Sequence, residues 1–334
     1  MISGYRCFRY LEMGGLGQVN LLVGRNNSGK TSVLEALYLL ASGGEPTALW
    51  RIVNRRGERL DLDAISPNRT LEVELDISHL FHGHDMRPTS KFTVQTKNSA
   101  HARSISYSIQ EAAASDQMDF DRGELPLLPR SVLSLQGSPK PLIGRMTLSA
   151  RGGLRLDGID QRPRRGRAER RTSAQYITTE SLSVDDLIVM WNDIVLTDSE
   201  ERVLTALRFL EPKIERLAAT AGPTTRYYSL GTRDGFKVKI RNVETPIPIG
   251  SLGDGMWRIL ALAISLIRAK DGVLLVDEID TGLHYSVMTN MWDLVYHTAR
   301  EFNVQVFATT HSYDCVQSLA SVCGPGEGRA NNVT

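Results

Sequence analysis

The stretch VNLLVGRNNSGKTSVLEALYLLA, residues 19–41, decides the fold, because a glycine-rich loop joins a short apolar run to a segment with apolar residues at helical spacing. Residues 24–31, GRNNSGKT, match the pattern GxxxxGK followed by Ser or Thr, between a predicted strand and a predicted helix. In that context backbone N–H groups turn inward around phosphate groups, and the positive end of the helix faces them. The stretch predicts a P-loop in an α/β fold; a tight turn of the same spelling is the weaker alternative.

The P-loop assigns roles to its side chains. Lys30 is expected to reach the β- and γ-phosphates of a nucleotide, and the hydroxyl of Thr31 is expected to bind Mg²⁺. The predicted nucleotide-binding residues are Gly24, Arg25, Asn26, Asn27, Ser28, Gly29, Lys30, Thr31 and Ser32. ATP and Mg²⁺ are therefore the expected cofactors.

A second apolar run, VLLV at residues 273–276, leads directly into Asp277 and Glu278. It predicts a buried strand, and α/β folds bind ligands beyond the carboxyl ends of their strands. Asp277 is expected to hold Mg²⁺ through its water shell, and Glu278 is expected to be the general base that polarises the attacking water. Two adjacent acids can also be a solvated strand end, but the P-loop favours the catalytic interpretation.

A third run, VQVFATTHS at residues 304–312, places His311 just after a predicted strand. A lone histidine there is most often an ordinary surface or core residue. Its position, one helix and one strand after the paired acids, favours contact with the γ-phosphate or the attacking water. The predicted catalytic residues are therefore Glu278, His311 and Lys30.

The glycine-rich stretch SLGDGMWRIL, residues 251–260, precedes the paired acids by about twenty residues. Gly253, Asp254 and Gly255 are expected to open a helix whose unsatisfied N–H groups and positive end suit a phosphate. A glycine-capped buried helix is the alternative.

These motifs together resemble those of the ABC-type ATPase heads, in the branch that holds RecF, the chromosome-maintenance ATPases and the OLD (overcoming lysogenization defect) family. The glycine-rich stretch is most similar to that of the OLD-type ATPases. The resemblance covers roughly the first 45 and the last 90 residues. It implies that residues 24–32 are Walker A, that Asp277 and Glu278 are Walker B, and that His311 is the switch histidine. It also implies a D-loop with Asp280, Gly282 and His284.

The resemblance further implies a homodimer, or a higher homo-oligomer, around nucleotides held between two heads. The signature residues Ser251, Gly253, Asp254 and Gly255 would then face the nucleotide of the partner subunit. The stretch departs from the transporter-type sequence LSGGQ, and only Gly253 and Arg258 agree with that pattern in a gap-free alignment. Gln175 is a weak candidate for the Q-loop glutamine.

The implied fold is a P-loop NTPase of ABC type whose head is split by a long mixed α+β insertion, since well over two hundred residues separate Lys30 from Asp277. Helical patterning is expected at residues 183–219, and strands at 91–96 and 236–242. The expected domains are an N-terminal ATPase lobe (1–48), a strand-rich and irregular insertion with a basic loop (49–182), a helical arm (183–245) and a C-terminal ATPase lobe (246–334).

Composition limits the partners and the cellular location that we expect for the protein. The chain has 334 residues, a net charge of +1 and three cysteines without CxxC spacing, so neither disulfides nor zinc are expected. No apolar run reaches the ~18 residues of a membrane span and no secretion signal is evident, so no membrane partner and a cytoplasmic location are expected. The candidate nucleic-acid contacts in a basic run are Arg162, Arg164, Arg165, Arg167, Arg170 and Arg171. A solvated or protein-binding loop is an equal alternative for that run.

OLD-type nucleases carry a TOPRIM nuclease domain beyond the switch histidine, whereas the given sequence ends about two dozen residues after His311. We therefore expect an ATPase without intrinsic nuclease activity, which regulates or scaffolds a separate effector, a nuclease or a toxin, in bacterial antiphage defence. A RecF-like DNA-repair or DNA-binding ATPase and a nucleotide-gated scaffold with negligible turnover are the alternatives.

Overall fold

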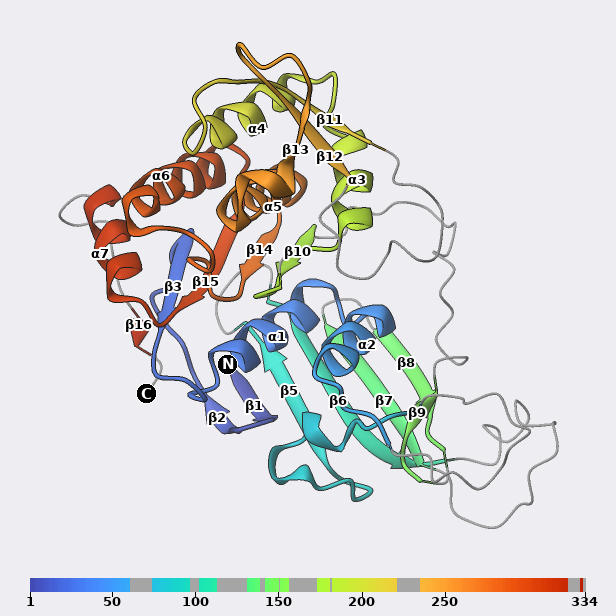
Figure 1. Cartoon of the computed structure of the whole chain (residues 1–334). Coiled ribbons are helices and arrows are strands. Elements are labelled where there is room, and N and C mark those ends of the chain that lie inside the picture. The colour runs from blue at the N-terminus through green and yellow to red at the C-terminus, as the bar shows by residue number, and fades with distance from the viewer. Residues whose placement is uncertain are drawn as a thin grey trace, which may run out of the picture. The chain divides into compact units, whose positions relative to one another are not determined.

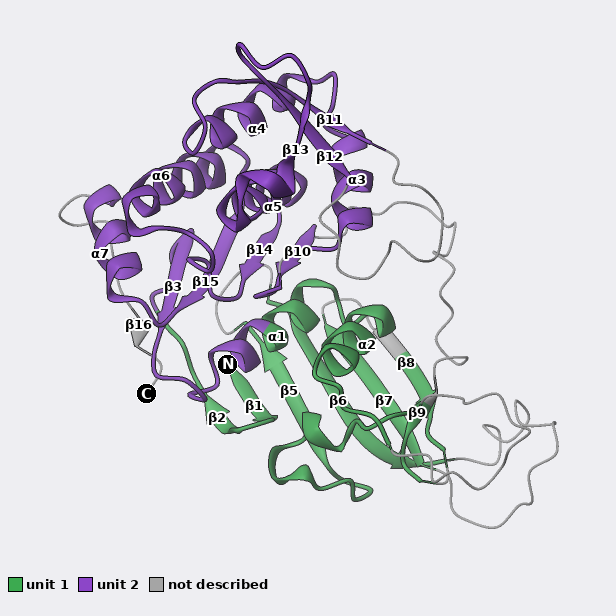
Figure 2. Cartoon of the chain, in the orientation of Figure 1, with its two compact units in different colours: residues 1–14, 35–171 green, residues 15–34, 172–334 purple. Residues whose placement is uncertain are grey.

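A computed structural model gives the structure of the chain as two compact units, which Figure 2 shows in different colours. Unit 1 comprises Met1–Gly14 and Glu35–Arg171, and unit 2 comprises Gly15–Leu34 and Thr172–Thr334. The boundaries between the two units lie at different residues from the predicted domain boundaries. The structure describes residues 1–60, 74–96, 102–112, 131–138, 142–149, 151–155, 173–180, 182–220, 235–323 and 331–332.

Unit 2 is built on a five-stranded parallel sheet with the order β10-β14-β15-β3-β16 (Figure 1). Its central strands are almost continuously apolar and buried, as expected for a parallel sheet that is covered on both faces. The strands are β10 (Ala174–Ile177), β14 (Val273–Val276), β15 (Gln305–Thr310), β3 (Val19–Val23) and β16 (Asn331–Asn332).

The helices of unit 2 alternate with the strands of this sheet. The P-loop helix α1 (Lys30–Ala41) follows β3, and its later turns belong to unit 1. Helix α5 is central to the core, because every residue from Met256 to Leu266 is buried. The remaining helices of this unit are α3 (Val184–Asn192), α4 (Asp198–Arg208), α5 (Asp254–Arg268), α6 (Tyr285–Glu301) and α7 (Tyr313–Val322), with a 3-10 turn, η4 (Ile249–Leu252), before α5.

A small antiparallel sheet in unit 2 corrects one prediction. Residues 214–219 were expected to be helical, but they form β11 (Ile214–Ala219), which pairs with β12 (Phe236–Ile240), itself paired with β13 (Ile247–Pro248). A bulge between Ile214 and Arg216 shifts the register, and Ile214 and Leu217 are both buried although they lie three positions apart. Their spacing resembles that of a helix, so the local pattern was misleading and the pairing with β12 decides the structure.

Unit 1 is dominated by a six-stranded antiparallel sheet with the order β2-β1-β5-β6-β7-β8. Strand β6 alternates buried and less buried residues over most of its length, as the strands of a one-sided sheet do. Strand β5 was expected from its sequence. The elements of unit 1 are β1 (Ile2–Tyr5), β2 (Phe8–Leu11), α2 (Pro46–Arg55), β4 (Glu74–Leu75), η1 (Ser78–Leu80), η2 (His82–His84), β5 (Lys91–Gln95), β6 (Ser104–Glu111), β7 (Ser131–Ser138), β8 (Leu142–Thr147) and β9 (Leu154–Arg155).

An aromatic cluster and a buried ionic cluster lie side by side in the core of unit 1. Phe92 stacks on Tyr107 with ring centroids 4.9 Å apart and lies 5.0 Å from the ring of Tyr5. The hydroxyl of Tyr5 donates to Glu35, a fully buried carboxylate at 0% exposure. Glu35 also pairs with Arg6 and with Arg56, each at 2.8 Å. Two guanidinium groups therefore compensate the charge that Glu35 of α1 buries.

The three cysteines differ in their exposure to solvent. Cys315 and Cys323 are buried and Cys7 is exposed, and all three are free thiols. Burial raises the pKa of Cys315 to about 12, which makes it an inert core thiol. Among the described helices, none is long and apolar enough to cross a membrane.

Replacing Glu35 by alanine tests the ionic cluster. The substitution leaves Arg6 and Arg56 without this carboxylate in the interior, and we expect the free energy of unfolding to fall by about 3–5 kcal/mol. Urea unfolding followed by circular dichroism measures the change. The control is Glu215→Ala, which breaks an exposed pair with Arg241 and should cost less than about 1 kcal/mol. Equal losses in the two variants would contradict a stabilising role for the cluster.

Candidate functional site

The P-loop joins β3 to α1, and its conformation leaves polar groups available to a ligand. Asn27 and Gly29 both have positive φ angles, 62° and 90°. The Nζ atom of Lys30 donates to the carbonyl oxygens of Gly24, at 2.7 Å, and Arg25, at 2.8 Å. The hydroxyl of Ser28 is buried and has no hydrogen-bond partner among the described residues. A buried hydroxyl and an ammonium group held only by carbonyls fit the phosphates of a nucleotide.

The first of the predicted acids lies against the P-loop helix. Thr31 Oγ1 donates to the carboxylate of Asp277, with distances of 3.0 Å to Oδ2 and 3.2 Å to Oδ1. Thr309 Oγ1 donates to Oδ1 of the same carboxylate at 2.8 Å. Asp277 is 3% exposed, and one hydroxyl group from the start of α1 and one from the end of β15 compensate its burial. A hydroxyl and a carboxylate are the oxygen ligands that Mg²⁺ prefers.

The donor set at this point is small. Within the described ranges, no group of three His, Cys, Asp or Glu side chains surrounds one point. Mg²⁺ usually keeps several waters and takes the rest of its ligands from one or two carboxylates and from substrate phosphates. The pair formed by Thr31 and Asp277 therefore fits a metal that arrives with a nucleotide.

The second acid is held in a special conformation beside the predicted histidine. Glu278 has a φ of 46°, and its backbone N–H donates to Thr309 Oγ1 at 2.8 Å. Its Oε1 atom lies 3.7 Å from Nδ1 of His311, and both side chains are partly exposed, at 36% and 52%. Thr281 Oγ1 donates to the other carboxylate oxygen at 3.4 Å. The structure thus brings Glu278 and His311 together where solvent has access.

The predicted D-loop follows immediately and contacts the glycine-rich stretch. Asp280 Oδ1 accepts a hydrogen bond from Thr310 Oγ1 at 2.7 Å. A Cβ atom added to Gly255 would lie 3.0 Å from the carbonyl oxygen of Gly282, so the glycine permits a close approach. His284 caps α6, because its Nδ1 accepts from the N–H of Ser286.

The glycine-rich stretch opens helix α5 as predicted. Gly253 occupies the N-cap position with a φ of 92°, and Asp254 is the first helical residue. No side chain in the described part of the chain caps this end. Ser251, Gly253 and Asp254 are exposed. The N-terminus of α5 is therefore open to solvent at Gly253 and Asp254, and the helix is buried from Met256 onward.

Sequence reasoning missed the role of Arg258. Its NH1 atom donates to the carbonyl oxygen of Thr178, and its NH2 atom donates to those of Asp277 and Glu278, each at 2.7 Å. Burial lowers the pKa of Arg258 to about 10, against the opposing effect of Asp277, Asp280 and Glu278. A signal did exist, since this is the one charged residue in the otherwise apolar run MWRILALAISLI. Thr309 was missed as well, because only strand pairing places it beside β14.

Other predicted residues stand apart from this site. Gln175 lies on β10, where it pairs with Leu274 of β14. The candidate nucleic-acid contacts between Arg162 and Arg171 lie outside the described residues.

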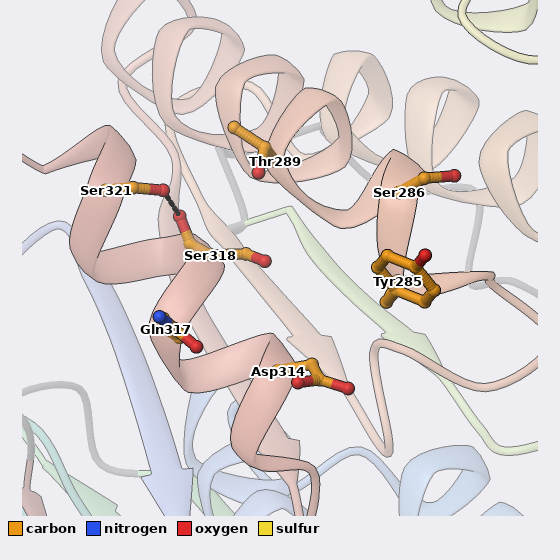
Figure 3. Close-up of a pocket in the computed structure, with 7 residues that line it drawn as sticks. All are labelled: Tyr285, Ser286, Thr289, Asp314, Gln317, Ser318 and Ser321. Carbon is orange, nitrogen blue, oxygen red and sulfur yellow. Dashed lines mark hydrogen bonds between the residues drawn. The ribbon is translucent and has the colours of Figure 1, made fainter.

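A polar groove of about 380 Å³ runs between α6 and α7 (Figure 3). It contains none of the predicted site residues. The residues that line it are Tyr285, Ser286, Thr289, Asp314, Gln317, Ser318 and Ser321.

Two family models match separate parts of the chain. The model described as "AAA ATPase domain" matches residues 1–120, which include the P-loop. The model described as "AAA domain, putative AbiEii toxin, Type IV TA system" matches residues 192–314, which include the paired acids and His311. The chain has the fold of an ABC-type P-loop ATPase. The fold class predicted from the sequence is thereby confirmed.

Individual relatives of the chain are distant in sequence. A Helicobacter pylori protein named "ATP/GTP phosphatase" is 21% identical over 337 residues, which cover 96% of this chain and 86% of that protein. An uncharacterized protein of Methanocaldococcus jannaschii is 31% identical over 109 residues, covering 30% of this chain and 47% of that protein. The family models and the phosphatase relative support nucleotide hydrolysis.

Solved structures similar to the chain include two SMC head domains. That from Thermotoga maritima has a TM-score of 0.45 at 12% identity and covers 95% of this chain and 89% of its own. An Smc head domain bound to the C-terminal domain of ScpA, derived from Pyrococcus furiosus, has a TM-score of 0.40 at 12% identity, with coverages of 95% and 90%. The similarity is too low to carry a conclusion about function.

Replacing Thr31 by alanine tests the metal assignment. The variant loses the hydroxyl that contacts Asp277, and we expect the Mg²⁺ concentration for half-maximal ATP turnover to rise by at least about 10-fold. A Mg²⁺ titration at fixed ATP measures it. Thr31→Ser keeps the hydroxyl and should behave like the wild type. If Thr31→Ala needed the same Mg²⁺ concentration for half-maximal turnover as the wild type, Thr31 would not be a metal ligand.

Proposed function

We propose that this ATPase binds ATP with Mg²⁺ at the carboxyl edge of the unit 2 sheet, hydrolyses it with Glu278 as general base, and dimerises around the nucleotide. In this role it regulates a separate nuclease or toxin in bacterial antiphage defence, in the cytoplasm. The observation that carries the proposal is the arrangement of Glu278 and His311, 3.7 Å apart, beside the hydrogen-bonded pair of Thr31 and Asp277.

The residues divide the chemistry between them. Thr31 and Asp277 would hold the metal, which supplies charge neutralisation at the phosphates. Lys30 would exchange its two carbonyl partners for phosphate oxygens. Glu278 is partly exposed and can accept the proton of the attacking water, and His311 is placed to orient that water or the γ-phosphate. Asp277, which is buried and held by two hydroxyls, is the poorer candidate for the base.

The first turn of α5 supports the proposal of a homodimer. The N-cap Gly253 and the first helical residue Asp254 are exposed, and no side chain among the described residues caps this end. A helix N-terminus has the N–H groups and the positive dipole end that bind phosphate. The nucleotide of the same chain already has a helix N-terminus, that of α1. We infer that Ser251, Gly253, Asp254 and Gly255 serve the nucleotide of a second copy.

The effector part of the proposal draws on the family model that matches residues 192–314. Its description reads "AAA domain, putative AbiEii toxin, Type IV TA system". An ATPase of this kind that works beside a toxin or nuclease is consistent with the OLD-like motifs of the sequence. Hydrolysis itself draws support from the Helicobacter pylori relative, which is named a phosphatase of ATP and GTP.

Replacing Glu278 by glutamine tests both hydrolysis and dimerisation. The variant keeps the shape of the side chain but loses the base, so we expect turnover to fall by about 10²- to 10⁴-fold while ATP still binds. The nucleotide-bound dimer should then accumulate, as measured by light scattering after gel filtration with ATP. Glu244→Gln, at an exposed turn, is the matched control. Equal turnover in wild type and Glu278→Gln would exclude Glu278 as the base and favour a scaffold without turnover.

Affinity purification from the native host tests the effector. With tagged Glu278→Gln and ATP, we expect a second protein with the signature of a nuclease or toxin, and we expect Lys30→Ala to recover less of it because nucleotide binding is impaired. Deletion of the gene should raise the plating efficiency of phages. A chain that purifies alone, together with unchanged phage sensitivity, would contradict the defence role.

A further inference from the structure

The backbone of Glu278 lies in the left-handed region, which side-chain-bearing residues rarely adopt. Its φ is 46°, directly after the buried strand β14. Such a conformation is costly for a residue other than glycine and persists only where the surroundings impose it. The position of the proposed base therefore depends on the groups that hold its two peptide units.

Hydrogen bonds hold both sides of Glu278. Its N–H group donates to Thr309 Oγ1 at 2.8 Å, and its carbonyl accepts from NH2 of Arg258 at 2.7 Å and from the N–H of Thr281 at 3.0 Å. Thr309 comes from β15 and is fully buried at 0% exposure. Arg258 comes from α5 and is 3% exposed. The N–H side of Glu278 is thus held by strand β15, and its carbonyl side is held by the following turn and by Arg258, the one side chain that donates to it among the described residues.

Arg258 is well suited to this contact. The planar guanidinium carries donors in a fixed fork, and two of its nitrogen atoms reach three carbonyl oxygens at the ends of β10 and β14. Burial lowers its pKa only to about 10, so the group keeps its charge at neutral pH. Its Nε atom is buried without a hydrogen-bond partner in the described part of the chain. Burying this cation is costly, and an apolar residue would suit the surrounding helix better.

We propose that Arg258 is a positioning residue for ATP hydrolysis, which fixes the left-handed backbone of Glu278 and so aims its carboxylate at the attacking water. Arg258 acts through Glu278 and does not contact the nucleotide. The inference rests on the proposed function, since it requires Glu278 to be the base.

A purely structural role makes different predictions. Arg258 also ties α5 to the ends of two strands, so a structural residue would lower stability and nucleotide affinity together. A positioning residue lowers kcat at nearly constant affinity, because the P-loop contacts remain. It also loses its effect once the Glu278 carboxylate is gone, since residues that act as a unit are not additive.

Replacing Arg258 by methionine and by lysine tests the proposal on the full chain. Arg258→Met is expected to lower kcat roughly 10- to 100-fold, with the affinity for a fluorescent ATP analogue within about 2-fold of wild type. Arg258→Lys keeps the charge and one donor group, and should retain intermediate turnover. The matched control is Arg268→Met on the same helix, whose exposed side chain pairs with Asp193 and which should turn over ATP like the wild type.

The deciding measurement repeats Arg258→Met in the Glu278→Gln background, where we expect no further loss of turnover. An equal loss in both backgrounds, unchanged kcat in the single variant, or a parallel loss of nucleotide affinity would overturn the proposal. Failure of both Arg258 variants to fold, shown by circular dichroism, would also overturn it in favour of a structural role. Failure of the proposed function is recognised separately, because Glu278→Gln alone would then leave turnover unchanged.

Discussion

The site in unit 2 depends on the burial of one carboxylate. Asp277 is almost inaccessible, and hydroxyl groups of Thr31 and Thr309 donate to it and compensate its burial. Asp277 follows β14, Thr309 lies in β15, and Thr31 lies in helix α1, which the P-loop joins to β3, so these contacts form only when the three strands are parallel and in register. The sheet order is thus linked to the polar contacts at its edge. The same contacts determine the position of Glu278, because it is the next residue along the chain.

The sequence predicted the parts of the site that are local in the chain. Each of these parts can be recognised from fewer than ten consecutive residues. They are the P-loop, the acids after β14 and the glycines at the start of α5. Thr309 and Arg258 could not be assigned, because their roles depend on which strand pairs with β14 and on where α5 crosses its end. The error at β11 has the same origin, since a bulge gave Ile214 and Leu217 a helix-like spacing. In each case, contacts between residues that are far apart in the sequence decide the structure.

Helix α5 combines two tasks that usually fall to separate elements. Its length fills the core of unit 2, with uninterrupted burial from Met256 to Leu266, while its N-terminus is exposed at Gly253 and Asp254 and uncapped by any described side chain. Arg258 lies about one turn from this end, and it is the charged residue within the buried stretch. A helix that is buried over most of its length and exposed at its N-terminus is fixed in place by core packing and can still offer backbone N–H donors to a ligand.

The contacts of Lys30 change the meaning of a measured nucleotide affinity. In this structure the ammonium group is already solvated by the loop itself, through the carbonyls of Gly24 and Arg25. Binding is therefore an exchange reaction in which phosphate oxygens replace two internal acceptors. The loop carbonyls and the phosphate oxygens compete for Lys30. The observed affinity therefore reports the difference in free energy between these two sets of hydrogen bonds. A weak dissociation constant would accordingly not imply a poor fit between the loop and the phosphates.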